Sequence, residues 1–415
     1  MDIQINPSKL RGEVNAPYSK SFLHRYIIAG FLSKEPCVIL GASNSKDIIA
    51  TLSALGSVGL NYSFGDNLIK LNVQELKQKA TINCIESGST LRFLLPVMCA
   101  LGVKASFTGS ERLLSRPTEK LVSCLNANGG GVDKFNVNGK LKSGKYVIDG
   151  TISSQYITGL LMALPLLSGD SEIIIEGESV SKDYINITLQ VLKEFKIKIK
   201  KTFTGYYVYG NQKYKAPKKI KVEGDYSNAS FLLSMGALSD SGIKVLNLNK
   251  KSKQGDKEIV AVLKKFGAIV KSVKGGYFVK KGNLKGLEID CENIPDIVQI
   301  ISVVASFSYG VTKLKNVKRL QIKESDRVQG IIDFLTLAGV KVEFDGNDLK
   351  ICGGAPKNNT FDGCNDHRTV MSEAVMASSV ISGASTIKGA EAVEKSYPNF
   401  FEDFIKLGGK INGNI

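Results

Sequence analysis

Residues 153–192 read SSQYITGLLMALPLLSGDSEIIIEGESVSKDYINITLQVL, and this stretch predicts a helix, a short strand, a polar loop and a second helix. Apolar residues recur at helical spacing after Ser153, and Gly169 supplies a typical end signal. Glu172–Glu176 is rich in β-branched residues, and Asp183 opens a second amphipathic pattern. Two further short strands are expected before the next helix begins, so the unit is helix, strand, helix and two strands.

The same unit recurs six times along the 415 residues. The starts of the first helices and the starts of the second helices each recur about every seventy residues. Such a period is the signature of a repeat architecture. The first helices are expected to open at Ser19, Ser87, Ser153, Asp225, Ile294 and Asp366, and the second near Asp47, Thr118, Asp183, Asp256, Asp326 and Pro398. Each unit is expected to be closed by the strand that enters the next unit, which predicts an α/β fold built from six βαβαββ units.

Composition favours a large globular core, since 43% of the residues are hydrophobic. The longest clean apolar run, Leu160–Leu167, contains Pro165 and is far shorter than a membrane span. Residues 1–11 lack the pattern of a signal or transit peptide, so a cytoplasmic location is expected. The seven cysteines are dispersed and only two histidines accompany them, which predicts buried thiols in a reducing compartment and no metal site.

The net charge of +16 is compatible with nucleic acid, an acidic membrane surface or small anionic substrates. The lysine-rich tracts Lys213–Lys221 and Lys250–Lys257 lack interleaved aromatic residues on a helical stripe and are typical of solvated surface. No linker rich in proline, glycine or serine divides the chain. A break between two related halves is expected near 222–225.

Cations at repeated positions carry more information than the total charge. A lysine or arginine precedes the start of every second helix: Lys46, Arg116, Lys182, Lys253, Lys323 and Lys395. Helix N-termini present unsatisfied N–H groups and about half a positive charge, so an added cation builds an anion site. First helices carry a guanidinium one turn inside, at Arg25, Arg92 and Arg368. The pattern predicts a cleft for small, multiply anionic ligands.

Three acids stand among these cations and are candidates for proton transfer: Asp296, Glu324 and Asp366. A carboxylate in a cationic pocket stays ionised and can act as a base or proton carrier. Asp366, like Asp326, opens a helix and is expected to pair or cap. Asp296 follows Pro295 and is expected to open an apolar helix, so structural and functional roles remain open for it.

The order of these motifs resembles the enolpyruvyl transferase family, specifically its members that act on shikimate 3-phosphate. The resemblance covers the whole chain. It rests on nine motifs: Ser19-Lys20-Ser21 with Arg25, Ser87-Gly88-Ser89-Thr90 with Arg92, Arg116-Pro117, Ser153-Ser154-Gln155, Ser181-Lys182-Asp183-Tyr184, Ile294-Pro295-Asp296, Lys323-Glu324-Ser325-Asp326-Arg327, Asn365-Asp366-His367-Arg368 and Lys395-Ser396-Tyr397-Pro398.

This resemblance implies a two-lobed, inside-out α/β barrel with three units per lobe. The N-terminal lobe would comprise residues 20–223 on the shikimate-phosphate side. The C-terminal lobe would comprise residues 1–19 and 224–415 on the phosphoenolpyruvate side, completed by the first strand. The implied reaction transfers the enolpyruvyl group of phosphoenolpyruvate to the 5-hydroxyl of shikimate 3-phosphate and releases phosphate, within aromatic amino acid (chorismate) biosynthesis. It needs no metal or organic cofactor, and a monomer that binds neither nucleic acid nor membrane is expected.

The family's functional residues carry over by position. The shikimate 3-phosphate set is Lys20, Ser21, Arg25, Ser153, Ser154, Gln155, Ser181, Tyr184, Asp296 and Lys323. The phosphoenolpyruvate set is Lys20, Gly88, Arg116, Gln155, Arg327, Arg368 and Lys395. Asp296 is expected to take the hydroxyl proton and Glu324 to carry the methylene proton, with Lys20 and Lys395 supporting proton transfer and phosphate departure.

Two positions depart from the family pattern. Glu86 stands where members often carry an amide or a small residue, and Arg319 stands where some have asparagine. The alternatives are the sister enzymes that transfer the same group to a UDP-amino sugar, and a basic nucleic-acid-binding repeat protein. The sister enzymes usually have a Lys-Asn pair where Lys20-Ser21 stands here, and often a cysteine in the loop that spans 109–115 here. Nucleic-acid binding would favour a basic stripe over cations at helix starts.

Overall fold

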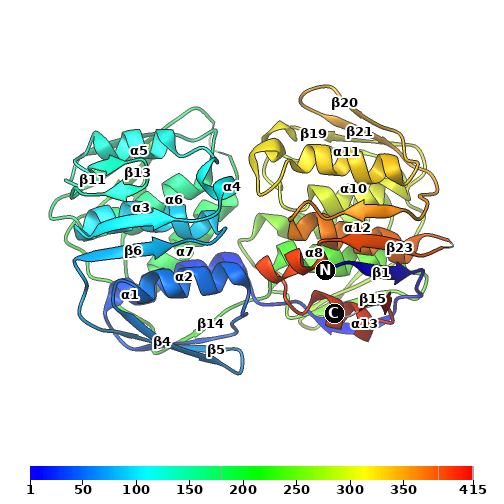
Figure 1. Ribbon diagram of the computed structural model, residues 1–415, viewed down its shortest axis with the longest axis horizontal. Helices are drawn as coiled ribbons and strands as arrows, with labels where there is room; N and C mark the ends of the chain where they lie inside the picture. Colours follow the sequence, from blue (N-terminus) through cyan, green and yellow to red (C-terminus); the bar gives the residue numbers. More distant parts are fainter. Residues whose placement is uncertain (179, 382, 414–415) are drawn as a thin grey trace. The chain divides into compact units, whose positions relative to one another are not determined.

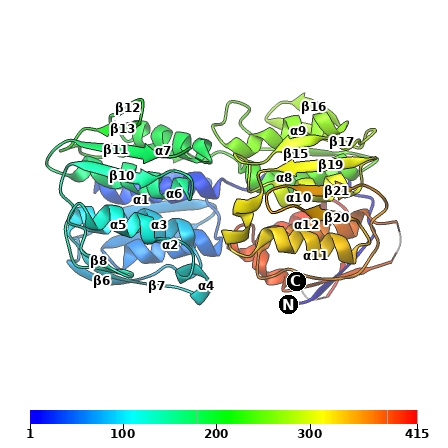
Figure 2. The ribbon, with the colours of Figure 1, turned by 90° about the horizontal axis from the view of Figure 1, so that it is seen from above.

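A computed structural model describes residues 1–178, 180–381 and 383–413, and its strands form six four-stranded sheets. The chain divides into two compact units. Residues 18–222 form the N-terminal unit, and residues 1–17 together with 223–415 form the C-terminal unit. Figure 1 shows the elements of both units, and Figure 2 shows them turned by 90°. None of the described helices has the length and apolar character needed to cross a membrane.

All six sheets share one pattern of pairing. In each sheet one edge strand pairs in parallel with its neighbour, and the other two strands add antiparallel. In the third module these strands are β10 (Lys145–Asp149), β11 (Ser171–Glu176), β13 (Gly205–Val208) and β12 (Ile199–Lys201). The βαβαββ repeat expected from the sequence is therefore confirmed.

The N-terminal unit holds two further sheets of this kind. They are β14 (Lys219–Lys221), β3 (Cys37–Leu40), β5 (Leu68–Val73) and β4 (Leu60–Gly65), and β6 (Lys79–Asn83), β7 (Lys104–Thr108), β9 (Asn136–Val137) and β8 (Val132–Asp133). The helices of the three modules are α1 (Lys20–Ser33), α2 (Lys46–Gly56), α3 (Gly88–Leu101), α4 (Glu111–Leu114), α5 (Glu119–Asn126), α6 (Ser154–Ala163), the 3₁₀ turn η1 (Leu164–Leu166) and α7 (Lys182–Glu194). The last strand of the unit, β14, thus completes its first sheet.

Two strands of the C-terminal unit, β1 and β2, come from the start of the chain. Its sheets are β16 (Ile269–Val273), β17 (Gly276–Lys280), β15 (Ile243–Leu246) and β2 (Gly12–Asn15); β18 (Glu288–Asp290), β19 (Val311–Lys315), β21 (Leu349–Cys352) and β20 (Val342–Phe344); and β22 (Thr360–Asp362), β23 (Ser385–Lys388), β1 (Ile3–Asn6) and β24 (Lys410–Asn412). Its helices are α8 (Tyr226–Leu238), η2 (Gly255–Glu258), α9 (Ile259–Phe266), α10 (Val298–Ser306), η3 (Lys318–Ile322), α11 (Arg327–Leu337), α12 (His367–Ser379), η4 (Ala390–Lys395) and α13 (Phe400–Lys406).

The first helix of each module lies in the interior. Helices α8, α10 and α12 pack against one another and are buried on nearly every face, as α3 and α6 are in the N-terminal unit (Figures 1 and 2). A helix that is apolar all round must be covered on all sides. The sheets therefore lie outside and the helices inside, which is the inside-out arrangement expected from the resemblance.

Gly159 shows how closely the inner helices approach. A Cβ atom at this position would lie 2.5 Å from the carbonyl oxygen of Arg92 and 2.7 Å from Pro96 on α3. Only glycine allows α6 to pack this near to α3. One turn earlier on α6, the side chain of Gln155 thereby reaches the side chain of Arg92.

The predicted helix starts are correct for most modules but wrong in the fifth. Helix α10 begins at Val298, not at Ile294. Pro295 disfavours helical geometry at the residue before it, and the N–H of Ile297 closes a turn onto the carbonyl of Ile294. Asp296 therefore lies in a turn before the helix. In the fourth module Asp256 lies in the 3₁₀ turn η2, which begins at Gly255, and the α-helix follows at Ile259.

One buried acid in the C-terminal unit has no polar partner. Glu373 on α12 is fully buried, and neither carboxylate oxygen has a hydrogen-bond partner among the described residues. Burial, with a smaller contribution from the charge of Asp362, raises the pKa of Glu373 well above its ordinary value. The folded chain therefore keeps this carboxyl protonated at a pH where the unfolded chain ionises it.

This linkage predicts that Glu373→Met stabilises the protein more at pH 8 than at pH 5. Unfolded Glu373 ionises near pH 4.5, so its contribution to stability falls as the pH rises above that value towards the folded pKa. We expect a gain of about 1–3 kcal/mol at pH 8, because a buried polar group without a partner is removed. Thermal unfolding at both pH values measures it, with Glu288→Met at an exposed position as the control. An equal gain at both pH values would contradict the linkage.

Candidate active site

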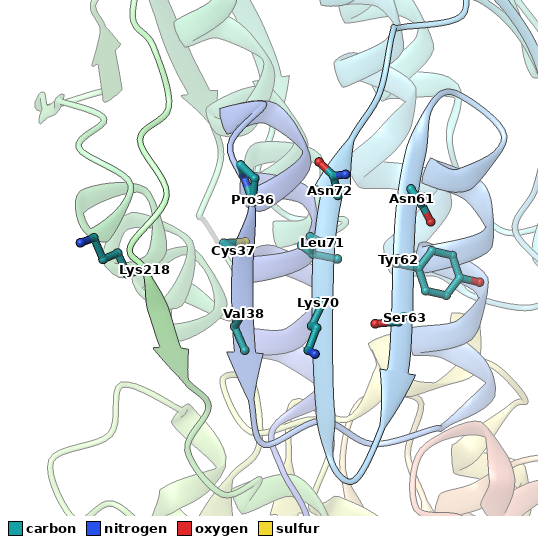
Figure 3. Close-up of a pocket in the computed structure, with 10 residues that line it drawn as sticks. All are labelled: Pro36, Cys37, Val38, Asn61, Tyr62, Ser63, Lys70, Leu71, Asn72 and Lys218. Atoms are coloured by element: carbon teal, nitrogen blue, oxygen red, sulfur yellow. The ribbon is translucent and has the colours of Figure 1, made fainter.

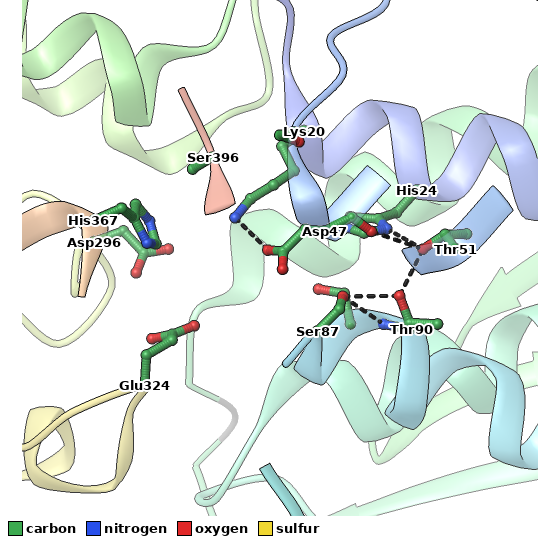
Figure 4. Close-up of polar contacts among 12 residues, drawn as sticks. Lys20, His24, Asp47, Thr51, Ser87, Thr90, Asp296, Glu324, His367 and Ser396 are labelled. Atoms are coloured by element: carbon green, nitrogen blue, oxygen red, sulfur yellow. Dashed lines mark hydrogen bonds and ion pairs between the residues drawn. The ribbon is translucent and has the colours of Figure 1, made fainter. Parts of the chain in front are cut away.

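The N-terminal unit places a lysine–carboxylate pair at the start of its first two helices. Lys20 is the first residue of α1, and its Nζ lies 2.6 Å from Oδ2 of Asp47 in the first turn of α2 (Figure 4). Both side chains keep some exposure, 16% and 18%. The pair orients the lysine and supplies a nearby acceptor for a proton. The sequence marked Lys20 as a site residue but Asp47 only as a helix start.

Arg25 lies one turn further into α1, where it is buried. Its guanidinium donates to the carbonyls of Ser21 and Tyr184 and to the hydroxyls of Thr158 and Thr188. Burial lowers the pKa of Arg25 to about 9, and no carboxylate of the described residues pairs with it. A buried cation with only neutral partners is a favourable neighbour for an anion.

Two more guanidinium groups converge on the start of α3. A Cβ atom at Gly88 would lie 2.7 Å from Nη1 of Arg92 and 2.8 Å from Nη1 of Arg116. Arg92 also donates to Oε1 of Gln155 at 3.1 Å and to the carbonyl of Pro117. Nε2 of Gln155 donates to the hydroxyl of Ser89. Glycine at position 88 leaves the N-terminus of α3 open beside two fixed cations, which is the geometry of an anion site.

The serine clusters at the starts of α6 and α7 differ in their local roles. Ser153 caps α6 by accepting the N–H of Gln155, and Ser154 is buried beside it. Ser181 precedes α7 in the left-handed region, with φ of 52° and ψ of 47°. A side chain held in this conformation costs about 1 kcal/mol or more, and such residues cluster at functional sites.

The C-terminal unit gathers its acids around one buried guanidinium. Arg327 is 1% exposed and contacts three carboxylates: Asp366 at 2.8 Å, Asp296 at 3.0 Å and Glu324 at 2.7 Å. Burial alone would lower the pKa of Arg327, but these acids together raise it above its usual value. Asp366 caps α12 through the N–H of Arg368, and Asp326 caps α11, as the sequence predicts for both.

The turn at Asp296 brings its carboxylate between two arginines. Nη1 of Arg368 donates to the Asp296 carbonyl at 2.7 Å, and its Nε lies 3.5 Å from Oδ1. Burial alone would raise the pKa of Asp296, but Arg368, Lys323 and Arg327 outweigh it and hold the pKa well below its usual range. Glu324, by contrast, keeps 31% of its side chain exposed. One of the two acids is thus firmly ionised and the other is accessible.

Lysines complete the charged group of this unit. Burial, together with the charges of Arg319 and Arg327, lowers the pKa of Lys323 to about 8, although Asp296 and Glu324 act to raise it. Nζ of Lys395 donates to the carbonyl of Asn365, and only 8% of this lysine is exposed. Arg319 donates to the carbonyl of Glu292.

The six cations at second-helix starts fall into two groups. Arg116 and Lys395 are buried and Lys323 is half-buried, whereas Lys46, Lys182 and Lys253 are exposed. Lys182 also pairs with Glu178 at the surface. Each module therefore supplies a cation. The three that are buried or half-buried are candidates for ligand binding, and the other three face solvent.

A further acid, Asp256, is part of the buried polar structure of this unit. The hydroxyl of Ser227 donates to it, and it is 3% exposed. Burial, with the charge of Asp296, raises the pKa of Asp256 to about 7. Sequence analysis treated it only as a helix start, because nothing in the local pattern shows that this position is buried.

A hollow of about 480 Å³ lies elsewhere, along β3, β4 and β5 (Figure 3). Its lining includes Lys70, Lys218 and several neutral polar side chains but no acid.

Cys37, which also lines this hollow, contributes a buried thiol whose pKa burial raises to about 11, so it is a poor nucleophile. None of the seven cysteines forms a disulfide, and the expectation that they are buried fails for Cys364, which is exposed, and for Cys352, which is half-buried.

The family model of EPSP synthase (3-phosphoshikimate 1-carboxyvinyltransferase) matches residues 5–404. The 3-phosphoshikimate 1-carboxyvinyltransferase of Clostridium kluyveri is 40% identical over 420 residues, which cover 99% of this chain and 98% of that protein. The chain belongs to the EPSP synthase family. The protein of the same description from Clostridium perfringens strain 13 is also 40% identical, with 98% of both chains covered.

Solved structures of this family share the fold. An EPSP synthase from Acinetobacter baumannii superposes with a TM-score of 0.81 at 21% identity, covering 99% of this chain and 100% of that one. The enolpyruvyl transferase NikO from Streptomyces tendae gives a TM-score of 0.77 at 13% identity, covering 99% and 98%. The resemblance to enolpyruvyl transferases is therefore confirmed. The EPSP synthase match decides against the UDP-amino-sugar and nucleic-acid alternatives.

The contacts of Arg327 predict a large loss of stability in Arg327→Leu. Removing this cation leaves the buried carboxylates of Asp296 and Asp366 unpaired, which typically destabilises by about 3–5 kcal/mol. Without Arg327 the pKa of each acid rises, so the loss is expected to shrink as the pH falls from 7 to 5. Urea unfolding of variant and wild type at both pH values measures this. A loss that is small, or that grows towards pH 5, would contradict the assignment of Arg327 as the organising cation.

Proposed function

We propose that this chain transfers the carboxyvinyl group of phosphoenolpyruvate to the 5-hydroxyl of shikimate 3-phosphate and releases phosphate, with Asp296 and Glu324 as its proton carriers. Its family makes it a 3-phosphoshikimate 1-carboxyvinyltransferase, a transferase of the shikimate pathway of aromatic amino acid biosynthesis. One observation carries the proton-transfer part: Arg327 holds both carboxylates, Asp296 through Nη1 and Glu324 through Nη2. Two acids on adjacent nitrogens of one fixed cation can serve two neighbouring atoms of a substrate.

The chemistry needs an acid and a base at one double bond. In the addition, the 5-hydroxyl oxygen bonds to C2 of phosphoenolpyruvate and loses its proton, while C3 gains a proton to become a methyl group. In the elimination, C3 loses a proton, the C2–C3 double bond returns and the C2–O bond to phosphate breaks. We assign the hydroxyl proton to Asp296 and the C3 proton to Glu324.

The charges around Asp296 suggest when this carboxylate becomes basic enough to take the hydroxyl proton. Arg368, Lys323 and Arg327 outweigh burial and hold its pKa low, so it is a weak base. Anionic substrates bound to these cations would offset their charge, and the pKa of Asp296 would rise towards the range that proton abstraction needs. Binding of the second anion would thus prepare the base for the first step.

The binding residues are proposed by unit. For shikimate 3-phosphate, the N-terminal unit would supply Lys20, Ser21, Arg25, Ser153, Ser154, Gln155, Ser181 and Tyr184, and the C-terminal unit Asp296 and Lys323. For phosphoenolpyruvate, the N-terminal unit would supply Lys20, Gly88, Arg116 and Gln155, and the C-terminal unit Arg327, Arg368 and Lys395. The buried Arg25 and the Gly88 site support anion binding in the N-terminal unit. Lys20 and Lys395 would assist proton transfer and phosphate departure.

The cellular setting is also a proposal. Seven unpaired cysteines suit a reducing compartment, which supports a cytoplasmic location. We further propose that the protein acts as a monomer, since one chain contains every residue assigned above.

Phosphate release tests the reaction directly. The purified protein is incubated with phosphoenolpyruvate and either shikimate 3-phosphate or a UDP-amino sugar, and inorganic phosphate is measured over time. We expect release with shikimate 3-phosphate and none above background with the UDP-amino sugar. Release with only the UDP-amino sugar, or with neither acceptor, would refute the proposed reaction.

The division of catalytic roles predicts that Asp296→Asn lowers kcat by about 10²–10⁴-fold, the usual range for removal of an acid–base group. Binding of phosphoenolpyruvate should persist, because the variant removes a negative charge from a cationic group. Glu324→Gln should lower kcat similarly and should also slow exchange of the C3 protons with solvent deuterium, which NMR measures. Asp333→Asn, at an exposed position on α11, is the matched control. Near-normal turnover by Asp296→Asn with both substrates bound would contradict the role of Asp296.

A further inference from the structure

A chain of four buried polar side chains connects the first three helices of the N-terminal unit. Nδ1 of His24 on α1 lies 2.7 Å from Oγ1 of Thr51 on α2, which lies 2.7 Å from Oγ1 of Thr90 on α3 (Figure 4). Thr90 Oγ1 lies 2.8 Å from Oγ of Ser87, the residue that caps α3. All four are at most 1% exposed. Polar groups so deeply buried are stable only because each has a partner.

The chain lies one helical turn below Lys20, which is assigned to substrate, and its partner Asp47. His24 follows Lys20 by four residues and Thr51 follows Asp47 by four, so each pair shares a helix face. Helices α1 and α2 are therefore bridged twice, by Lys20–Asp47 at their starts and by His24–Thr51 one turn inside. The Thr51–Thr90 bond extends this bracing to α3, whose N-terminus faces the guanidinium groups of Arg92 and Arg116 at Gly88.

The hydrogen bonds assign a direction to this chain. Each hydroxyl has a single proton, and Thr51 has a poorer second acceptor in the carbonyl of Asp47 at 3.4 Å. Thr90 donates its hydroxyl proton to Ser87, so Thr51 donates to Thr90 and Nδ1 of His24 donates to Thr51. Nε2 of His24 then carries only a lone pair, which is less costly to bury without a partner than an N–H would be.

The imidazole of His24 stays neutral in the folded protein. Burial first, and then the charges of Lys20 and Arg25, lower the pKa of His24 well below its usual value. Its ring also meets Phe93 edge-on, with centroids 6.4 Å apart. A neutral, fixed imidazole adds no charge beside the cations that bind substrate. Ser87 accepts both the N–H and the hydroxyl of Thr90, which fixes the first turn of α3.

We propose that His24, Thr51 and Thr90 are positioning residues that hold the start of α3, with Gly88, in register with Lys20 and thereby set the affinity for phosphoenolpyruvate. The inference rests on the proposed function, which assigns Lys20, Gly88 and Arg116 to that substrate. None of the three residues needs to touch substrate. Loss of one link lets α3 shift against α1 and α2, and an anion site built from two fixed guanidinium groups tolerates little displacement.

Thr51→Val tests the link because valine keeps the shape of threonine and lacks its hydroxyl. We expect the KM for phosphoenolpyruvate to rise about tenfold, the scale of one lost buried hydrogen bond. The KM for shikimate 3-phosphate should change less than about twofold, because its residues lie on α1, α6 and α7 within this unit. Thr51→Ser restores the hydroxyl and should restore the wild-type KM. A purely structural role would lower the thermal midpoint with both KM values unchanged, and that result would overturn the proposal.

The double variant Thr51→Val/Thr90→Val guards against a folding defect. It removes both hydroxyls of the α2–α3 link, so no unpaired hydroxyl remains between these helices. If the link positions α3, the rise in the KM for phosphoenolpyruvate in the double variant should be smaller than the product of the rises in Thr51→Val and Thr90→Val, because both changes break the Thr51–Thr90 bond. Thr90→Val alone also removes the bond to Ser87. Multiplied effects of the two changes would overturn the proposal.

Thr312→Val in the C-terminal unit is the matched control. Thr312 is fully buried on β19, but its hydroxyl has no partner in the described structure, so the same substitution removes no hydrogen bond. Its KM values should equal those of the wild type, and a tenfold rise would overturn the argument from the lost bond. Absence of phosphate release by the wild type would refute the proposed function, whereas wild-type turnover with an unchanged KM in Thr51→Val would refute this inference alone.

Discussion

The inner helices of this protein are buried on almost every side, and this burial constrains where a ligand can be met. In α3, α6, α8, α10 and α12 nearly every side chain is covered by neighbouring helices or by the sheets outside them. A helix without a solvent-facing side can present charged groups to a ligand only at its ends. The N-terminal end carries the free N–H groups and the positive end of the dipole, so it suits anions. The burial of these helices therefore places anion sites at their N-terminal ends, whichever side chains lie there.

The two units use this shared architecture with opposite electrostatics. In the N-terminal unit the buried cation Arg25 has neutral partners, namely two threonine hydroxyls and two carbonyls, and the more exposed Lys20 pairs with Asp47. In the C-terminal unit the central cation, Arg327, is surrounded by carboxylates. The neutral surroundings of Arg25 favour binding of anions. The group around Arg327 instead holds carboxylates that can exchange protons.

The sequence predicted the elements well because the repeat recurs with two landmarks, and each module repeated the same evidence. It failed at Asp296 because Pro295 breaks the local helical pattern and moves the start of α10 to Val298. It missed Asp47 as the partner of Lys20, and it missed the His24–Thr51–Thr90 chain. These contacts join residues on different helices, and local periodicity cannot show which faces meet. The exposure of Cys364 and the unpaired burial of Glu373 also depend on tertiary packing.

The pairing of Asp296 with two arginines explains how a strongly ionised acid can still serve as a base. Its low pKa follows from the charges of the protein itself, because Arg368, Lys323 and Arg327 together outweigh the effect of burial. Each anion that contacts Arg368 or Lys323 weakens the hold of that cation on the carboxylate. The same anion would favour the protonated form of Lys323, whose pKa burial has lowered to about 8. Under the proposed roles, binding would shift protons towards Lys323 and basicity towards Asp296, so the acid–base group would become active only when the substrates are in place.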